Sequence, residues 1–196
     1  MATAGIVLAE WATHKPKGPR FLSLFPEVFI NMSVLIEFAQ SLQDSQFGTA
    51  LAESRYVFPL VEAVHLLGLS VSVGLIFLTD LRLIGLLLKG VTVPVLLRQL
   101  RPWVLGGFAA TFISGVLLFI AEGATVIVSP AFPAKFLFIA LAGLNALYFE
   151  FRLAGKTLSL SAEAALPTAI KFAGVASITL WTLVIIAGRL IPYLPG

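Results

Sequence analysis

The segment that decides the fold is residues 57–79, which read VFPLVEAVHLLGLSVSVGLIFLT. As a helix it is long enough to cross a bilayer, which requires about 20 apolar residues. Glu62 and His65 are the acidic and basic side chains within it. Ionisable groups inside a membrane are costly, so they are candidates for function by default.

Three further segments share this apolar character, namely residues 103–121, 136–149 and 172–188. Only 12% of the residues are charged and the mean hydropathy is +1.00, whereas soluble domains carry about 25% charged residues. The third segment is short, and it spans a bilayer when Lys135 and Arg152 are counted as ends whose charges extend toward the headgroups. We therefore predict an all-α integral membrane protein in which residues 54–196 form a four-helix bundle in the lipid bilayer.

Residues 1–53 form an N-terminal extension in this prediction. Within it, residues 33–47 have the periodicity of an amphipathic helix, which we expect to lie at the membrane surface,. Its apolar face consists of Leu35, Phe38 and Leu42. An earlier apolar run at 21–30 is interrupted by a proline and a glutamate, so we do not count it as a fifth span.

The positions of the basic residues predict the orientation. Connections 80–102 and 150–171 hold Arg82, Lys89, Arg98, Arg101, Arg152, Lys156 and Lys171. By the positive-inside rule these connections are cytoplasmic, and both chain ends then lie outside. Because the charges are spread along membrane edges rather than gathered on one face, the net charge of +3 does not indicate a nucleic-acid partner,. The absence of cysteine excludes disulfides, thiolate metal sites and c-type haem attachment,.

One face of the first span carries Glu62, His65, Gly68 and Ser72. Separations of three, four and seven residues return to the same side of a helix. An imidazole with small residues beside it suits a flat macrocycle, so we predict His65 as the iron ligand of a b-type haem. The other candidate contacts are Arg82, Arg101 and Arg189 for the propionates, Trp103 and Trp181 as aromatic walls, and Asn145 as a polar contact. The predicted function is electron transfer within the membrane to an unidentified redox partner.

The sequence leaves several alternatives open. The other histidine is His14, and Met1 and Met32 lie outside the spans, so a second iron ligand has to come from His14, another subunit or an unconventional donor, or else the iron is five-coordinate. Copper is an alternative to haem. His65 could instead be a structural hydrogen-bonding residue in a non-redox oligomeric scaffold or accessory subunit. No phosphate-binding loop, HExxH sequence or catalytic triad pattern is present, so an electron carrier fits better than an enzyme.

Several short motifs resemble a known family. They are YVFPLVEAVHLLG (56–68), DLRLIG (80–85), RPW (101–103), SG (114–115), Lys135, NA (145–146) and GRLIPY (188–193). Over about residues 33–196 the chain resembles a bacterial family of small four-helix inner-membrane proteins of unknown function. That family is similar in style to b561-type cytochromes and copper-resistance membrane proteins, which implies haem or copper. Relatives often carry a second histidine near the Asn145 motif, where this chain has Phe149 and Glu150, and this departure argues against a two-histidine site inside one subunit.

The second span carries two stripes of small residues at intervals of four. One stripe is Gly106, Ala110 and Ser114, and the other is Gly107, Thr111 and Gly115. Small residues at this spacing let membrane helices approach closely. One stripe serves the interior of the bundle, and the second implies another neighbour, so we predict a homo-oligomer.

The charge distribution generates a topology prediction. A periplasm-dependent reporter enzyme fused after Gly196 should be active, because four spans with cytoplasmic basic connections leave the C-terminus outside. A matched fusion inside connection 150–171 should be inactive. Activity of a cytoplasm-dependent reporter at Gly196 would contradict this orientation.

Overall fold

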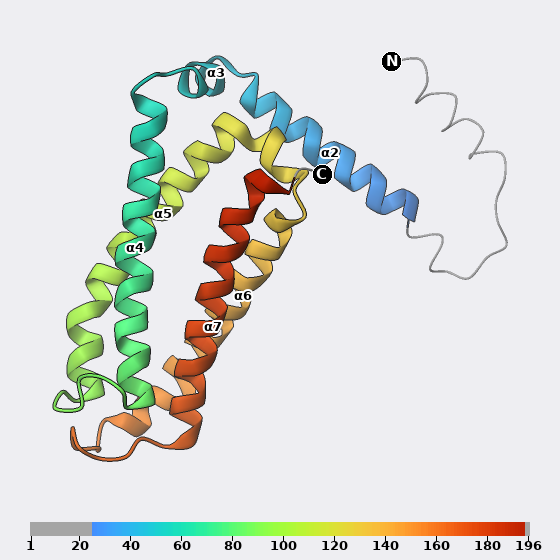
Figure 1. The fold of residues 1–196 in the computed structure, drawn as a ribbon. Coiled ribbons are helices and arrows are strands. Elements are labelled where there is room, and N and C mark those ends of the chain that lie inside the picture. Colours follow the sequence, from blue (N-terminus) through green and yellow to red (C-terminus); the bar gives the residue numbers. More distant parts are fainter. Residues whose placement is uncertain (1–24, 195–196) are drawn as a thin grey trace, which may run out of the picture. The chain divides into compact units, whose positions relative to one another are not determined.

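A computed structural model describes residues 25–194, with side chains from Ser33 onward. Its helices are α2 (Phe25–Gln43), α3 (Gln46–Ala52), α4 (Val57–Ile84), α5 (Val93–Ile127), α6 (Ala131–Tyr148), the π-helix η1 (Phe149–Leu153), the 3₁₀ helix η2 (Ala154–Thr157), α7 (Thr168–Leu190) and the 3₁₀ helix η3 (Ile191–Tyr193) (Figure 1). The described residues contain no strand, so the all-α prediction is confirmed. The chain divides into two units after Phe38, and the following paragraphs concern the second unit. Residues 1–24, including His14, lie outside the described part.

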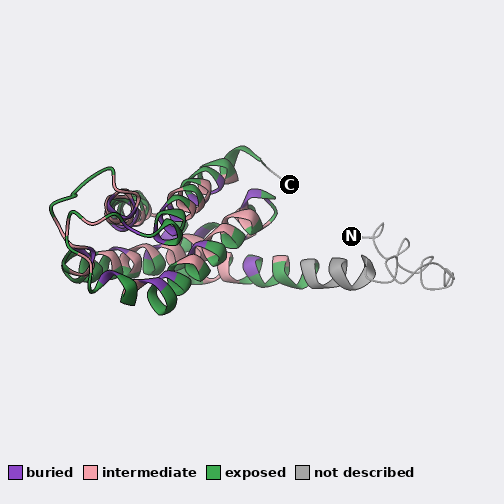
Figure 2. Cartoon of the chain, turned by 90° about the horizontal axis from the view of Figure 1, so that it is seen from below, coloured by how far each residue is buried: buried purple, intermediate pink, exposed green. Residues whose placement is uncertain are grey.

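Four helical segments are long and apolar enough to cross a membrane, and they are Val57–Ile84, Val93–Ile127, Ala131–Thr157 and Thr168–Tyr193. Between 6% and 22% of their most apolar stretches is buried inside the protein. Exposed residues cover the outward faces of these helices (Figure 2), and large apolar side chains such as Phe112 and Phe172 are among them. So much apolar surface requires a hydrocarbon surrounding. The prediction of a multi-pass membrane protein with four spans is confirmed.

The helices are longer than the predicted spans. The second span begins at Val93 rather than 103, and the third begins at Ala131 rather than 136. Our prediction ended each span at a charged residue, whereas helical hydrogen bonds continue through charged residues that reach the headgroup region. Lys135, predicted as the end of the third span, is therefore helical. Glu122 also lies inside α5, but at a kink where its own backbone is not helical.

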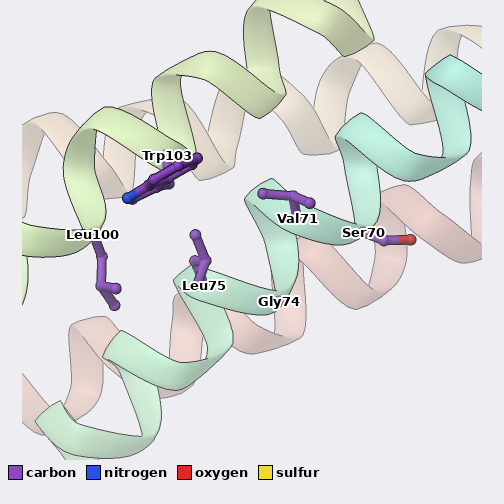
Figure 3. A pocket seen from close by; sticks show the side chains of 6 residues that line it. All are labelled: Ser70, Val71, Gly74, Leu75, Leu100 and Trp103. Atoms are coloured by element: carbon purple, nitrogen blue, oxygen red, sulfur yellow. The ribbon is translucent and has the colours of Figure 1, made fainter.

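Pro102 and Trp103 lie inside α5, although the predicted span began only at residue 103. Pro94 occupies the first turn of α5, where a missing N–H is tolerated,. The Trp103 side chain is 69% exposed and lines a cavity of about 520 Å³ on the outward side of the α4–α5 pair (Figure 3). The other lining residues are Ser70, Val71, Gly74, Leu75 and Leu100. Trp103 therefore faces the surroundings rather than the bundle interior.

The helix expected over 33–47 is two helices, because the chain turns between α2 and α3. Ser45 caps α3, with its hydroxyl accepting the Gly48 N–H at 3.0 Å,. Gly48 lies inside α3, and its bare Cα allows the Gln43 carbonyl to approach closely. The Gln43 side-chain oxygen in turn accepts the Ala124 N–H at 3.2 Å. This bond fastens the end of α2 to α5.

The bundle consists of two antiparallel helix pairs. α4 packs along α5, α6 packs along α7, and α4 also packs along α7, whereas α5 and α6 have few contacts (Figure 1). The contacts between α5 and α6 include the stacked rings of Phe119 and Phe132, whose centroids are 5.9 Å apart. The seam between α4 and α7 is therefore the main connection between the two pairs.

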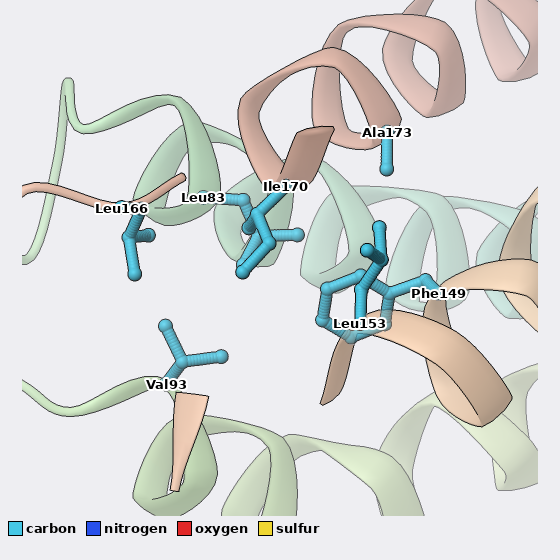
Figure 4. Packing of buried hydrophobic residues seen from close by; sticks show 7 residues of the cluster. All are labelled: Leu83, Val93, Phe149, Leu153, Leu166, Ile170 and Ala173. Atoms are coloured by element: carbon cyan, nitrogen blue, oxygen red, sulfur yellow. The ribbon is translucent and has the colours of Figure 1, made fainter. Parts of the chain in front are cut away.

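The apolar core lies at one end of the bundle, which we call the basic end because the lysines and arginines of residues 80–102 and 150–171 lie toward it. Its buried side chains are Leu83, Val93, Phe149, Leu153, Leu166, Ile170 and Ala173 (Figure 4). Arg82 is 3% exposed there, and its guanidinium donates to the carbonyls of Val91 at 2.7 Å and Ala162 at 2.8 Å. One side chain thus binds both connections. We call the opposite end of the bundle the far end.

Glycines allow α4 and α5 to meet at backbone distance. A Cβ on Gly68 would lie 2.8 Å from the Gly107 carbonyl oxygen, and a Cβ on Gly107 would lie 2.8 Å from the Gly68 carbonyl oxygen. Ser72 is fully buried beside them, and its hydroxyl donates to the Gly68 carbonyl at 2.9 Å. The predicted stripe that contains Gly107 therefore packs inside the chain, as membrane helices with small residues do.

Gly107→Ala should destabilise the bundle, because the added methyl group would collide with Ser72 and the Gly68 carbonyl. Overpacking of this kind typically costs about 1–3 kcal/mol. Gly106→Ala is the matched control, since nothing lies within 4 Å of its added Cβ. Denaturant titration in mixed micelles measures both, and equal unfolding free energies for the two variants would contradict the packing.

Candidate functional site

His65 lies in the seam between α4 and α5, toward the far end. Its Nδ1 is 3.0 Å from the Thr111 carbonyl oxygen and 3.2 Å from the Ser114 hydroxyl. Gly115 flanks the ring, because a Cβ there would lie 3.1 Å from the His65 Cε1. The imidazole is half-buried, and a backbone carbonyl and a side-chain hydroxyl of α5 hold it against that helix.

These contacts determine which ring nitrogen carries the proton. A carbonyl oxygen can only accept, so Nδ1 must donate to Thr111. The Ser114 hydroxyl donates its own proton to the Ala110 carbonyl at 2.6 Å, which leaves a lone pair directed to His65. Both hydrogen bonds of His65 in the described part of the chain use Nδ1. Nε2 of the neutral ring is therefore a lone-pair donor that can bind a metal or accept a proton.

Sequence reasoning missed the electrostatic influence of Lys135 on His65. Lys135 lies on α6, and its charge acts on the imidazole. The aliphatic stem packs over Gly188 of α7, with Cε 3.5 Å from where a Cβ would be. We expected Lys135 at a membrane edge because α6 was predicted to begin after it. The missed signal is Pro130 before Ala131, which places the helix start five residues earlier.

Two carboxylates also lie toward the far end. Glu62 on α4 and Glu122 on α5 are both exposed and act on each other electrostatically. Glu122 has a non-helical backbone, with φ −136° and ψ 17°, at a kink in α5. Acidic and basic side chains from α4, α5 and α6 therefore occur at this end.

Gly68 and Ser72 share the His65 face, as the helical periodicity predicts. That face is packed against α5, so the space beside Gly68 is filled by Thr111 and the Gly107 backbone. The Thr111 hydroxyl is buried without a hydrogen-bond partner among the described residues. In this conformation Gly68 and Ser72 thus serve helix packing and leave no room for a flat ligand between the two helices.

The predicted propionate contacts lie in different places. Arg101 forms an ion pair with Glu150 at 2.7 Å, toward the basic end, and Arg82 is bound to the connections there. Arg189 donates to the Tyr193 hydroxyl at 3.0 Å on the far-end helix terminus. Of these three arginines, only Arg189 belongs to the same end of the bundle as His65.

The remaining candidates also serve interhelix packing. Asn145 donates its side-chain amide to the Ala173 carbonyl at 3.0 Å, which joins α6 to α7. Trp181 packs on Phe108 with ring centroids 5.1 Å apart, which joins α7 to α5. Among the described residues, no three His, Cys, Asp or Glu side chains lie close enough to hold a metal ion.

The fold and this site define a four-span membrane protein in which the one histidine of the described residues lies inside a span, with its Nδ1 hydrogen-bonded to the Thr111 carbonyl. Residues 49–194 match the model of a family of unknown function, DUF6644, and the chain belongs to that family. No curated protein and no solved structure matches the chain.

Gly115→Ala should move the His65 ring, because its methyl group would lie 3.1 Å from Cε1 and the ring must shift by a few tenths of an ångström. The NMR shift of the His65 Cε1–H group reports that movement. Gly143→Ala is the control, since nothing lies within 4 Å of its Cβ. An unchanged signal in Gly115→Ala would contradict the contact.

Proposed function

We propose that this protein is a membrane-embedded haem b protein that transfers electrons, with Nε2 of His65 as an iron ligand. The observation that carries the proposal is the Nδ1–H hydrogen bond to the Thr111 carbonyl. A histidine that ligates a metal usually donates its other ring N–H to a carbonyl or carboxylate, which fixes the tautomer and the ring orientation. Haem bound there would supply one-electron chemistry, and the protein would set its potential through the axial ligand and burial.

Haem fits the donor set better than copper does. The described residues hold no cluster of three metal-ligating side chains, and a copper ion needs several protein ligands. A haem iron receives four nitrogen ligands from its macrocycle and requires one or two from the protein. A single interior histidine is therefore sufficient for haem.

The position of His65 changes which other residues would contact the haem. Lys135 and Arg189 would be the partners of the propionates, because Lys135 acts on His65 and Arg189 belongs to the same end of the bundle. Arg82, Arg101, Trp103 and Asn145 take no part in this proposal, because each has a packing, ion-pair or surface position elsewhere. The ligand would approach His65 from the Nε2 side, not from the packed Gly68 face.

The membrane, the orientation and the oligomeric state of the protein belong to the same proposal. We place the protein in a bacterial inner membrane with its C-terminus outside, in agreement with the basic residues of the two connections,. A homo-oligomer would supply a second iron ligand from another subunit. The family that the sequence motifs resemble is similar in style to b561-type cytochromes, and this resemblance supports haem as a proposal.

A second candidate function is a non-redox oligomeric scaffold or accessory subunit. One observation favours it, namely that both hydrogen bonds of His65 fasten α4 to α5. Buried polar side chains that join helices help to fix helix order in membranes. In that case His65 would be structural and would bind no cofactor.

Absorption spectra of the full chain, purified after expression with added haem precursor, test the proposal. The wild type should show a Soret band, and His65→Ala should lose it while still inserting, because the change makes its span more apolar. His65→Met should retain haem with a changed potential, since methionine also ligates iron. Ser70→Ala, on the outward face of α4, is the control and should keep the wild-type spectrum.

Carbon monoxide difference spectra then distinguish an open from an occupied sixth coordination position of the iron. His14→Ala tests whether His14 of the N-terminal extension is the second ligand. A wild-type protein that contains no haem after this expression, or a His65→Ala variant that keeps the full Soret band, would refute the proposal and leave the scaffold function.

A further inference from the structure

Asp80 is a buried acid in the α4–α7 seam, near the basic end. It is 5% exposed, and its carboxyl group shares a hydrogen bond with the Ser177 side chain of α7. Its Oδ2 atom is fully buried and has no hydrogen-bond partner among the described residues. The helices are close at this point, because a Cβ on Gly174 would lie 3.1 Å from the Asp80 carbonyl oxygen.

No counter-ion accompanies this carboxyl group in the described part of the chain. Arg82 is the nearest charged residue along α4, but it donates to the Val91 and Ala162 carbonyls. Lys171 on α7 and Arg98 on α5, the helices packed on α4, are both exposed. Burial and the Ser177 hydrogen bond are the influences that act on Asp80.

An unpaired carboxylate in such a seam is strongly unfavourable, since a buried charge needs a partner and further hydrogen bonds. A neutral carboxylic acid avoids that desolvation penalty. The Ser177 contact is compatible with both forms, because a hydroxyl can donate to a carboxylate or accept from a carboxylic acid, so burial without a counter-ion is the deciding observation. The geometry therefore favours a carboxyl group that carries a proton.

We propose that Asp80 and Ser177 form a proton-binding site between α4 and α7. The proton comes from water and is held on the Asp80 carboxyl group, and its release leaves a carboxylate in the seam. A metal cation is disfavoured, because hard cations take six or more oxygen ligands and no cluster of three acidic or histidine ligands exists among residues 33–194. This site is separate from His65 and does not depend on haem.

The consequence of the site is that proton binding and helix packing are linked. The α4–α7 seam is the main connection between the two helix pairs. A proton on Asp80 keeps this seam neutral, whereas its loss places an unpaired charge between two closely packed backbones. The site therefore couples protonation to the spacing of the pairs.

Infrared spectroscopy of the full chain in lipid nanodiscs at neutral pH tests the proposal. The wild type should show the C=O stretching band of a protonated carboxyl group, and this band should move in heavy water. Asp80→Asn, which has the shape of the neutral acid, should fold and lose the band. Ser177→Ala should keep the band but shift it to higher frequency, because a hydrogen bond is lost.

Glu150→Gln, which removes an exposed carboxylate of the Arg101 ion pair, is the control and should keep the band unchanged. Absence of the band in the wild type, its persistence in Asp80→Asn, or an unshifted band in Ser177→Ala would overturn the proposal. Sodium-specific thermal stabilisation of the wild type that is absent in Asp80→Asn would also overturn it, by showing a metal cation instead. If Asp80→Asn does not fold, the band shift in Ser177→Ala tests the proposal by itself: a shift supports a protonated Asp80, and an unshifted band overturns it.

Discussion

Backbone contact between α4 and α5 is the constraint on which the rest of the structure depends. Water supplies no driving force between helices in a bilayer, so they associate through van der Waals contact and interhelix hydrogen bonds. Gly68 and Gly107 remove the side chains that would keep the helix axes apart. Only because of that approach does the Thr111 carbonyl come within 3.0 Å of the His65 ring. The tautomer of the one described histidine is thus a result of helix packing.

The two ends of the bundle are built differently. The basic end has a packed apolar core and a buried arginine, whereas the far end has exposed carboxylates, a kinked α5 and a lysine whose charge acts on the histidine. Functional sites commonly occupy the less tightly packed part of a fold, where local opening requires less free energy. This asymmetry would suit the ligand chemistry that we propose for His65.

Hydropathy alone was sufficient to predict the four spans and the interior position of His65, because the transfer free energy of a segment depends on its composition and not on its neighbours. The helix ends were not predictable in this way, since α6 continues through Lys135, where the hydropathy pattern predicts an end. The packing of Gly68 against α5 was not predictable for another reason. A small residue on a helix face permits either a ligand or another backbone to approach, and one sequence does not distinguish the two. The same ambiguity applies to Trp103, whose aromatic ring suits a cofactor wall and a lipid contact equally.

The buried Arg82 has a consequence for the order in which the chain folds. Its guanidinium binds the first connection at Val91 and the last connection at Ala162, which are far apart in sequence. During synthesis the first two helices are complete long before Ala162 exists, so Arg82 must remain hydrated or bound to lipid phosphate until the third helix has crossed. The first hairpin can therefore insert early, but its basic end reaches its final form only when the segment before α7 arrives. Assembly of the basic end is therefore a late step of folding, because Arg82 needs the Ala162 carbonyl for its second contact.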